Sequence, residues 1–137
     1  MTSPKASQKT ILISGANRGI GAATAEAFHR AGWCLSLGMR KPEMPAWADA
    51  DRVQVHAYDA ADAKAAEPWA AAALARFGRI DAVVANAGIS VRKTAVEASD
   101  EEFSSLMDIN VHAPRRLVKA CWTPLIASGA GRVVIVA

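Results

Sequence analysis

The sequence predicts an α/β protein in which helices cover both faces of a parallel β-sheet. Two observations support this fold class. Short runs rich in β-branched and other apolar residues alternate with longer helical segments, and many boundaries carry a glycine or a proline. Such alternation favours right-handed crossovers, which make the strands parallel and bury the sheet on both faces. The 137 residues, 52% apolar and 21% charged, suffice for one such domain with a single core.

Five strands are expected, over residues 9–14, 33–39, 52–58, 80–85 and 132–137. Three longer helices are expected between them, over residues 20–31, 62–77 and 99–125. Pro42 and Pro45 leave room for only a short helix between the second and third strands.

The helix boundaries follow from capping signals. Asp62 is expected to cap the second helix, which Gly78 closes. Ser99 and Glu102 form a capping box at the start of the third helix. This helix is expected to bury one apolar face, made of Phe103, Leu106, Met107, Val111, Leu117, Val118, Cys121 and Leu125.

Composition restricts the possible classes of protein. Residues 1–8 are polar and are expected to form a disordered tail without a signal peptide, and no segment is long enough to span a membrane. Cys34 and Cys121 lie far apart in apolar stretches, which favours buried, reduced thiols and a cytoplasmic protein. The three histidines lack the spacing of metal ligands, so no metal site is expected. The net charge of +3, without basic runs, disfavours nucleic-acid binding but suits a phosphate-bearing ligand.

Residues 14–21, Ser-Gly-Ala-Asn-Arg-Gly-Ile-Gly, join the first strand to the first helix. Gly15 permits a tight turn, Gly19 lets backbone N–H groups approach a phosphate, and Gly21 lets the helix pack close to the strand. An anion bound there would meet free N–H groups and the positive end of the helix dipole. The turn therefore predicts a site for the pyrophosphate of a nicotinamide dinucleotide. A purely structural turn is the alternative that three glycines alone leave open.

The spacing Gly-x-x-x-Gly-x-Gly resembles the turn of the short-chain dehydrogenase/reductase family, and three later stretches agree. Residues 84–88, Val-Ala-Asn-Ala-Gly, are similar to the family's Asn-Asn-Ala-Gly motif, with Ala85 replacing its first asparagine. Asp59 matches the acidic residue that holds the adenine amino group. Residues 108–111, Asp-Ile-Asn-Val, match the stretch that supplies the catalytic asparagine. The resemblance extends from Lys9 to the last residue.

The resemblance implies a three-layer, doubly wound Rossmann-type domain over residues 9–137. Its strand order would be 3-2-1-4-5, and the last strands and helices of the family would be lacking. The cofactor would be held by Gly15, Asn17, Arg18, Gly19, Ile20, Gly21, Arg40, Asp59, Ala60, Asn86, Ala87 and Gly88. Two of these residues have structural alternatives: Asp59 as a loop cap and Asn86 as a support for the strand ends.

Asn110 is the one member of the family's catalytic set that maps onto this chain. It is expected on the buried face of its helix, where an unpaired amide would be costly. Pro114, four residues later, has no N–H to donate, so the Asn110 carbonyl loses its intrahelical partner. A freed carbonyl beside a polar side chain can hold a water, and the resemblance implies a water on the proton-relay path. A simple proline kink is the alternative.

The choice of cofactor depends on the end of the second strand. In members that prefer NAD, the resemblance places a carboxylate where this chain has Met39, and that carboxylate would repel a 2′-phosphate. Arg18 and Arg40 can clamp a phosphate dianion, with Lys41 assisting. These residues predict NADP(H) over NAD(H), with two solvated surface arginines as the alternative.

The resemblance also implies a serine after the fifth strand, a tyrosine on the next helix and a lysine four residues further on. The only tyrosine here is Tyr58, in the third strand, and Asp62 follows it by four residues. The sequence therefore predicts a carbonyl/alcohol oxidoreductase whose C-terminal half lies outside these residues, so that the chain alone is inactive. The alternative is a truncated, non-catalytic dinucleotide-binding or regulatory module. The apolar strand at 132–137 argues against that alternative, because such a strand is not expected at a sheet edge.

A small carbonyl or alcohol substrate is expected, with residues 89–96 beside it. A homo-oligomer is expected from the resemblance alone.

Overall fold

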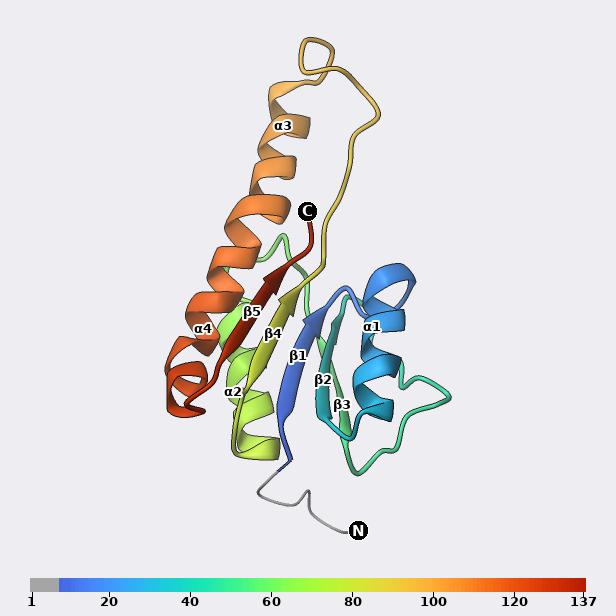
Figure 1. Ribbon diagram of the computed structural model, residues 1–137. Coiled ribbons are helices and arrows are strands. Elements are labelled where there is room, and N and C mark those ends of the chain that lie inside the picture. Colours follow the sequence, from blue (N-terminus) through green and yellow to red (C-terminus); the bar gives the residue numbers. More distant parts are fainter. Residues whose placement is uncertain (1–7) are drawn as a thin grey trace.

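The computed structural model describes residues 8–137 and shows a five-stranded parallel sheet between two layers of helices (Figure 1). The strand order is β3-β2-β1-β4-β5, as predicted. The strands are β1 (Thr10–Ser14), β2 (Cys34–Met39), β3 (Val53–Ala57), β4 (Ala82–Ala85) and β5 (Arg132–Ile135). The helices are α1 (Gly19–Arg30), α2 (Ala66–Phe77), α3 (Asp100–Met107) and α4 (Ala113–Ala127), with a π-helical turn (Asp108–His112) before α4.

The predicted tail over residues 1–8 lies outside the described residues except for Gln8. The side-chain amide of Gln8 donates to the carbonyl oxygen of Gly32 at 3.4 Å. Both cysteines are free and buried, as predicted, and desolvation raises the pKa of Cys121 to about 12.

The sheet separates two apolar cores. β1 lies in the middle of the sheet and is buried along its whole length, as is β2 beside it. α1 covers one face, and α2 and α4 pack together on the other (Figure 1). Trp69 of α2 is fully buried in the second core and donates from Nε1 to Ser36 Oγ of β2 at 2.9 Å. Because all five strands are parallel, their carboxyl ends lie together at one edge of the sheet.

Two helix starts were predicted from capping residues, and one prediction is wrong. Ser99 Oγ accepts from the N–H of Glu102 at 3.1 Å, which confirms the cap of α3. Asp62 does not cap α2, because that helix begins four residues later at Ala66. The Asp62 carboxylate instead accepts from the N–H of Lys64 at 2.9 Å, in a turn before the helix.

The predicted buried face of the last helix is also partly wrong. Leu117, Cys121 and Leu125 are buried as expected, but Phe103 and Val111 are about half exposed. Met107 is 38% exposed, and Leu106 and Val118 are partly buried. The physical reason is visible in Figure 1: α3 extends past the end of the sheet, so no layer of the described structure covers it.

The hydrogen-bonding pattern of the helix changes just before Pro114. The helix changes to a π-helical turn over Asp108–His112, in which Ala113 N donates to the carbonyl of Asp108 five residues back. The π-helical turn thus closely precedes Pro114, whose missing N–H cannot donate to the carbonyl oxygen of Asn110.

β5 pairs with β4 and forms the edge of the sheet in the described structure. Its residues Val133, Val134 and Ile135 are 41–54% exposed. An apolar edge of this kind was not expected from the sequence. Among residues 8–137, no helix is long and apolar enough to cross a bilayer.

Candidate functional site

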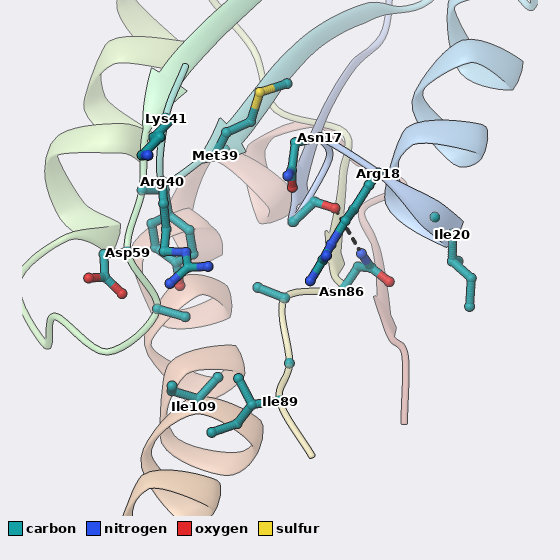
Figure 2. Close-up of a pocket in the computed structure, with 17 residues that line it drawn as sticks. Asn17, Arg18, Ile20, Met39, Arg40, Lys41, Asp59, Asn86, Ile89 and Ile109 are labelled. Atoms are coloured by element: carbon teal, nitrogen blue, oxygen red, sulfur yellow. Dashed lines mark hydrogen bonds between the residues drawn. The ribbon is translucent and has the colours of Figure 1, made fainter. Parts of the chain in front are cut away.

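A cavity of about 800 Å³ opens at the carboxyl edge of the sheet, where parallel α/β folds bind ligands (Figure 2). It is lined by the end of β2, the start of α1, the loops after β1, β2, β3 and β4, and one residue of the π-helical turn. The lining residues are Gly15, Asn17, Arg18, Gly19, Ile20, Gly38, Met39, Arg40, Lys41, Tyr58, Asp59, Ala60, Asn86, Ala87, Gly88, Ile89 and Ile109. Every residue predicted to bind the cofactor lies in this set except Gly21.

The glycine turn after β1 is tied to the end of β2. The N–H groups of Gly15 and Ala16 both donate to the carbonyl oxygen of Gly38, at 3.0 and 3.4 Å. Gly15 and Gly19 adopt left-handed φ angles of +64° and +57°, which side chains disfavour. Apart from its chain neighbours and the backbone of α1, no atom of the described residues lies within 4 Å of where a Gly19 Cβ would stand. The turn therefore presents bare backbone to the cavity.

Gly21 has a packing role instead of a lining role. A Cβ at this position would collide with the carbonyl oxygen of Gly15 and lie 2.6 Å from Nδ2 of Asn86. That Nδ2 donates to the same Gly15 oxygen at 3.2 Å, as the dashed line in Figure 2 shows. The N–H groups of Asn86 and Ala87 both donate to Ser14 Oγ at 2.9 Å. Asn86 thus joins the loops after β1 and β4, the structural role that the sequence left open.

The first turn of α1 borders the cavity through Gly19 and Ile20. Arg18, the N-cap residue, is extended, and within the described chain no side chain caps the helix. The first turn contains no acidic residue. Its N–H groups and the positive end of its dipole are therefore available to an anion. This uncapped helix start beside a glycine cradle fits a diphosphate.

Three cationic residues line the cavity. The side chains of Arg18 and Arg40 extend into it from two different loops, with Lys41 next to Arg40 (Figure 2). Met39, at the end of β2, is buried, so an apolar group occupies that position. Asp59 also lines the cavity. Its Oδ1 accepts from the N–H of Ala61 at 2.9 Å, so this carboxylate also caps the loop that follows β3.

Three lining residues were missed by the sequence analysis: Gly38, Tyr58 and Ile109. Tyr58 is almost fully buried, and its ring centre lies 4.7 Å from that of Trp69. Desolvation raises the pKa of its hydroxyl to about 12, so the phenol stays neutral at ordinary pH. Their place in the sequence could have indicated them, because Gly38 and Tyr58 lie at or next to the carboxyl ends of β2 and β3, where the cavity forms.

Asn110 is exposed and its amide is paired, so its predicted place on a buried face is wrong. Nδ2 donates to the carbonyl oxygen of Ile89 at 2.8 Å, and Oδ1 accepts from the N–H of Ile89 at 2.9 Å. Asn110 does not line the cavity, but its neighbour Ile109 and its partner Ile89 do. It therefore ties the π-helical turn to the loop after β4.

Comparison with known proteins agrees with this geometry. The family model described as short chain dehydrogenase matches residues 9–137. The chain belongs to the short-chain dehydrogenase family. Agropine synthesis reductase of Rhizobium rhizogenes is 37% identical over 128 residues, which are 90% of this chain and 30% of that protein. Oxidoreductase UcpA of Escherichia coli K12 is 35% identical over 96% of this chain and 52% of its own length.

Solved structures of the family superpose closely. A short-chain dehydrogenase from Streptomyces avermitilis has a TM-score of 0.86 and 33% identity, over 94% of this chain and 48% of that one. An alcohol dehydrogenase from Thermococcus sibiricus, complexed with 5-hydroxy-NADP, has a TM-score of 0.81 and 34% identity. That match covers 93% of this chain and 57% of the other. The chain thus spans between about a third and somewhat more than half of these relatives.

Proposed function

We propose that the chain is the cofactor-binding part of an NADP(H)-dependent oxidoreductase that interconverts a carbonyl and an alcohol on a small molecule. The observation that carries the proposal is the uncapped start of α1 beside a bare glycine turn, with Arg18 and Arg40 in the same cavity. The nicotinamide cofactor, when bound, supplies or accepts the hydride.

The residues of this chain would bind and orient that cofactor. The turn at residues 15–21 and the first N–H groups of α1 would hold the pyrophosphate. Arg18 and Arg40, assisted by Lys41, would hold the 2′-phosphate, because guanidinium groups match phosphate oxygens in pairs. Asp59 and Ala60 would contact the adenine.

The remaining part of the cavity would hold the nicotinamide end. Asn86, Ala87 and Gly88 would form its wall, and Asn110 would fix the adjoining loop through Ile89. Tyr58 is a buried neutral phenol in the proposed adenine half, which leaves it no part in proton transfer. The 137 residues alone are therefore expected to bind nucleotide without general-acid help in hydride transfer.

The cofactor preference is tested by removing both arginines. Dissociation constants for NADPH and NADH are measured by calorimetry for the Arg18→Ala/Arg40→Ala protein and for an Arg30→Ala/Arg115→Ala control that loses the same charge elsewhere. Each charge-assisted bond to a phosphate contributes about 1.5–3 kcal/mol, so NADPH affinity should fall by about tenfold or more. NADH affinity should change little. Equal losses for both nucleotides would refute the preference, and binding of neither nucleotide by the unaltered chain would refute the function.

A homo-oligomer is proposed as well, formed through the outer face of α3 and α4. Five large apolar side chains are exposed on these helices and on the π-helical turn between them: Phe103, Met107, Val111, Trp122 and Ile126. Clusters of exposed apolar groups commonly mark protein contacts. Sedimentation should show a species larger than one chain, and Trp122→Glu should reduce it. A monomer at every concentration would refute this proposal.

A further inference from the structure

The segment between β2 and β3 carries two cations of the cavity and is held at its far end by a histidine. Residues 40–52 form neither helix nor strand, and Arg40 and Lys41 at their start line the cavity. His29, in the last turn of α1, accepts at Nε2 from the N–H of Asp49 at 3.1 Å. Nη2 of Arg52 lies 3.1 Å from the same His29 nitrogen.

The chemistry of these partners fixes the protonation state of the histidine. A backbone N–H and a guanidinium can only donate, so Nε2 of His29 must offer a lone pair to both Asp49 and Arg52. The imidazole is therefore neutral, with its proton on Nδ1. Protonation of Nε2 would bring its N–H face to face with the donor groups of Asp49 and Arg52, and would place a cation next to Arg52.

Further contacts complete this cluster, here called the His29 clamp (His29, Trp47, Asp49 and Arg52). The rings of His29 and Trp47 lie 5.1 Å apart. Arg52 also donates from Nη1 to the carbonyl oxygens of His29 and Trp33, at 3.1 and 2.9 Å. The clamp thereby joins the segment to the end of α1, whose first turn faces the phosphate site.

Some charged groups around the imidazole of His29 lower its pKa and others raise it. Desolvation lowers the pKa of His29 most, and the Arg52 guanidinium lowers it further. Asp49 from the segment and Glu26 from α1 itself raise it by smaller amounts. The balance keeps His29 neutral near pH 7 and makes the clamp sensitive to mild acid.

We propose that neutral His29 is a positioning residue that holds the 40–52 segment against α1, and that its protonation releases this segment and weakens the grip on a 2′-phosphate. Pro42 and Pro45 restrict the backbone between Lys41 and the clamp, so displacement at the clamp is transmitted toward the cavity. The effect on the 2′-phosphate rests on the proposed function. The release of the segment does not.

Hydrogen exchange of the nucleotide-free chain tests the release directly. Protection of the amides of residues 46–52 is measured at pH 7.5 and 5.5 and corrected for intrinsic exchange rates. Linkage allows at most about a tenfold change per pH unit below the free histidine pKa of about 6.5. Protection should therefore fall by up to about tenfold in the unaltered chain. The amides of β1 should keep their protection at both pH values.

Two variants of His29 separate the proposal from a general loss of stability. In His29→Gln the side-chain oxygen can still accept but cannot titrate, so protection should be the same at both pH values. In His29→Phe the ring still contacts Trp47 but cannot accept, so protection should be low at both. A fall in the unaltered chain that His29→Gln reproduces would overturn the proposal, as would no fall at all.

Nucleotide binding tests the consequence for the cavity. The 2′-phosphate itself titrates near pH 6, so the measure is the NADPH affinity of the unaltered chain relative to His29→Gln. The unaltered chain should lose up to about tenfold more affinity between pH 7.5 and 5.5, with no such difference for NADH. Identical NADPH profiles would overturn the effect on the phosphate. If the unaltered chain binds neither nucleotide at pH 7.5, the proposed function fails, while hydrogen exchange still decides on the clamp.

Discussion

Replacing Gly21 by alanine should distort the proposed phosphate site, because Gly21 packs against the glycine turn without lining the cavity. The added Cβ would collide with the carbonyl oxygen of Gly15 and come within 2.6 Å of Nδ2 of Asn86. Gly15 cannot retreat freely, because its N–H donates to Gly38 and its oxygen accepts from Asn86. The first turn of α1 must therefore move away from β1.

The cost follows from two contributions. Overpacking a buried position typically costs about 1–3 kcal/mol of folding free energy. Displacing the first turn of α1 also weakens its hydrogen bonds to a bound diphosphate, each with a net contribution of about 0.5–1.5 kcal/mol. Gly21→Ala should thus lose about 1–3 kcal/mol of unfolding free energy, and its affinity for either nucleotide should fall by about tenfold or more.

Urea unfolding and calorimetric titration with NADPH and NADH measure the two effects. Gly32→Ala is the matched control just past the C-terminal end of the same helix, because Gly32 has a φ of +90° and, its chain neighbours aside, no described atom within 4 Å of an added Cβ. It should lose about 1–2 kcal/mol through backbone strain and keep its nucleotide affinity. The reasoning is refuted if Gly21→Ala matches the unaltered chain in both measurements, or if Gly32→Ala loses as much affinity.

Two further predictions concern single side chains near the cavity. The pKa of Tyr58 is raised from 10 to about 12 in the folded state, so its contribution to stability is fully present below pH 10 and is lost as pH rises toward 12. The unfolding free energy should fall by roughly 2–3 kcal/mol over this interval, and Tyr58→Phe should remove that fall; a phenolate absorbance that titrates near pH 10 in the folded protein would contradict this. Asn110→Leu loses both bonds to Ile89, so urea unfolding should show a loss of about 1–3 kcal/mol. An unchanged midpoint would show that these bonds contribute nothing.

The strands were predictable because a parallel strand buried on both faces is a continuous apolar run. β1 and β2 match this pattern, and both are buried throughout. The order of the strands was not contained in the alternation itself, because many orders satisfy the same right-handed crossovers. It came from the family resemblance, which supplies topology that local sequence does not.

The error at α3 has a physical cause. Periodicity indicates which side of a helix is apolar, but it does not say whether another layer covers that side. Leu117 and Cys121 belong to α4, which packs against β4 and β5, and are buried, whereas Phe103 and Met107 belong to α3, which extends past the sheet. The same stripe therefore has two environments, and only the arrangement of layers distinguishes them.

The candidate site divides in a similar way between local and long-range features. The glycine turn was predictable because its residues are consecutive and its requirements concern the backbone. Gly38 and Tyr58 were not found because their importance depends on Trp69, which lies on another element. Besides the position at a strand end, a glycine inside a strand was a second signal for Gly38, since it often marks a close approach of another group.

Gly38 connects the core to the glycine turn that lines the cavity. A Cβ on Gly38 would come within 2.6 Å of the Trp69 indole, so only glycine lets that ring pack there. The Gly38 carbonyl oxygen meanwhile accepts from the N–H groups of Gly15 and Ala16. The ring is held in turn by its bond to Ser36, whose hydroxyl donates to Gln54 Oε1 at 2.7 Å. The Trp69 indole and the glycine turn therefore both contact Gly38, so the packing of the core holds the residue that accepts the hydrogen bonds of the turn.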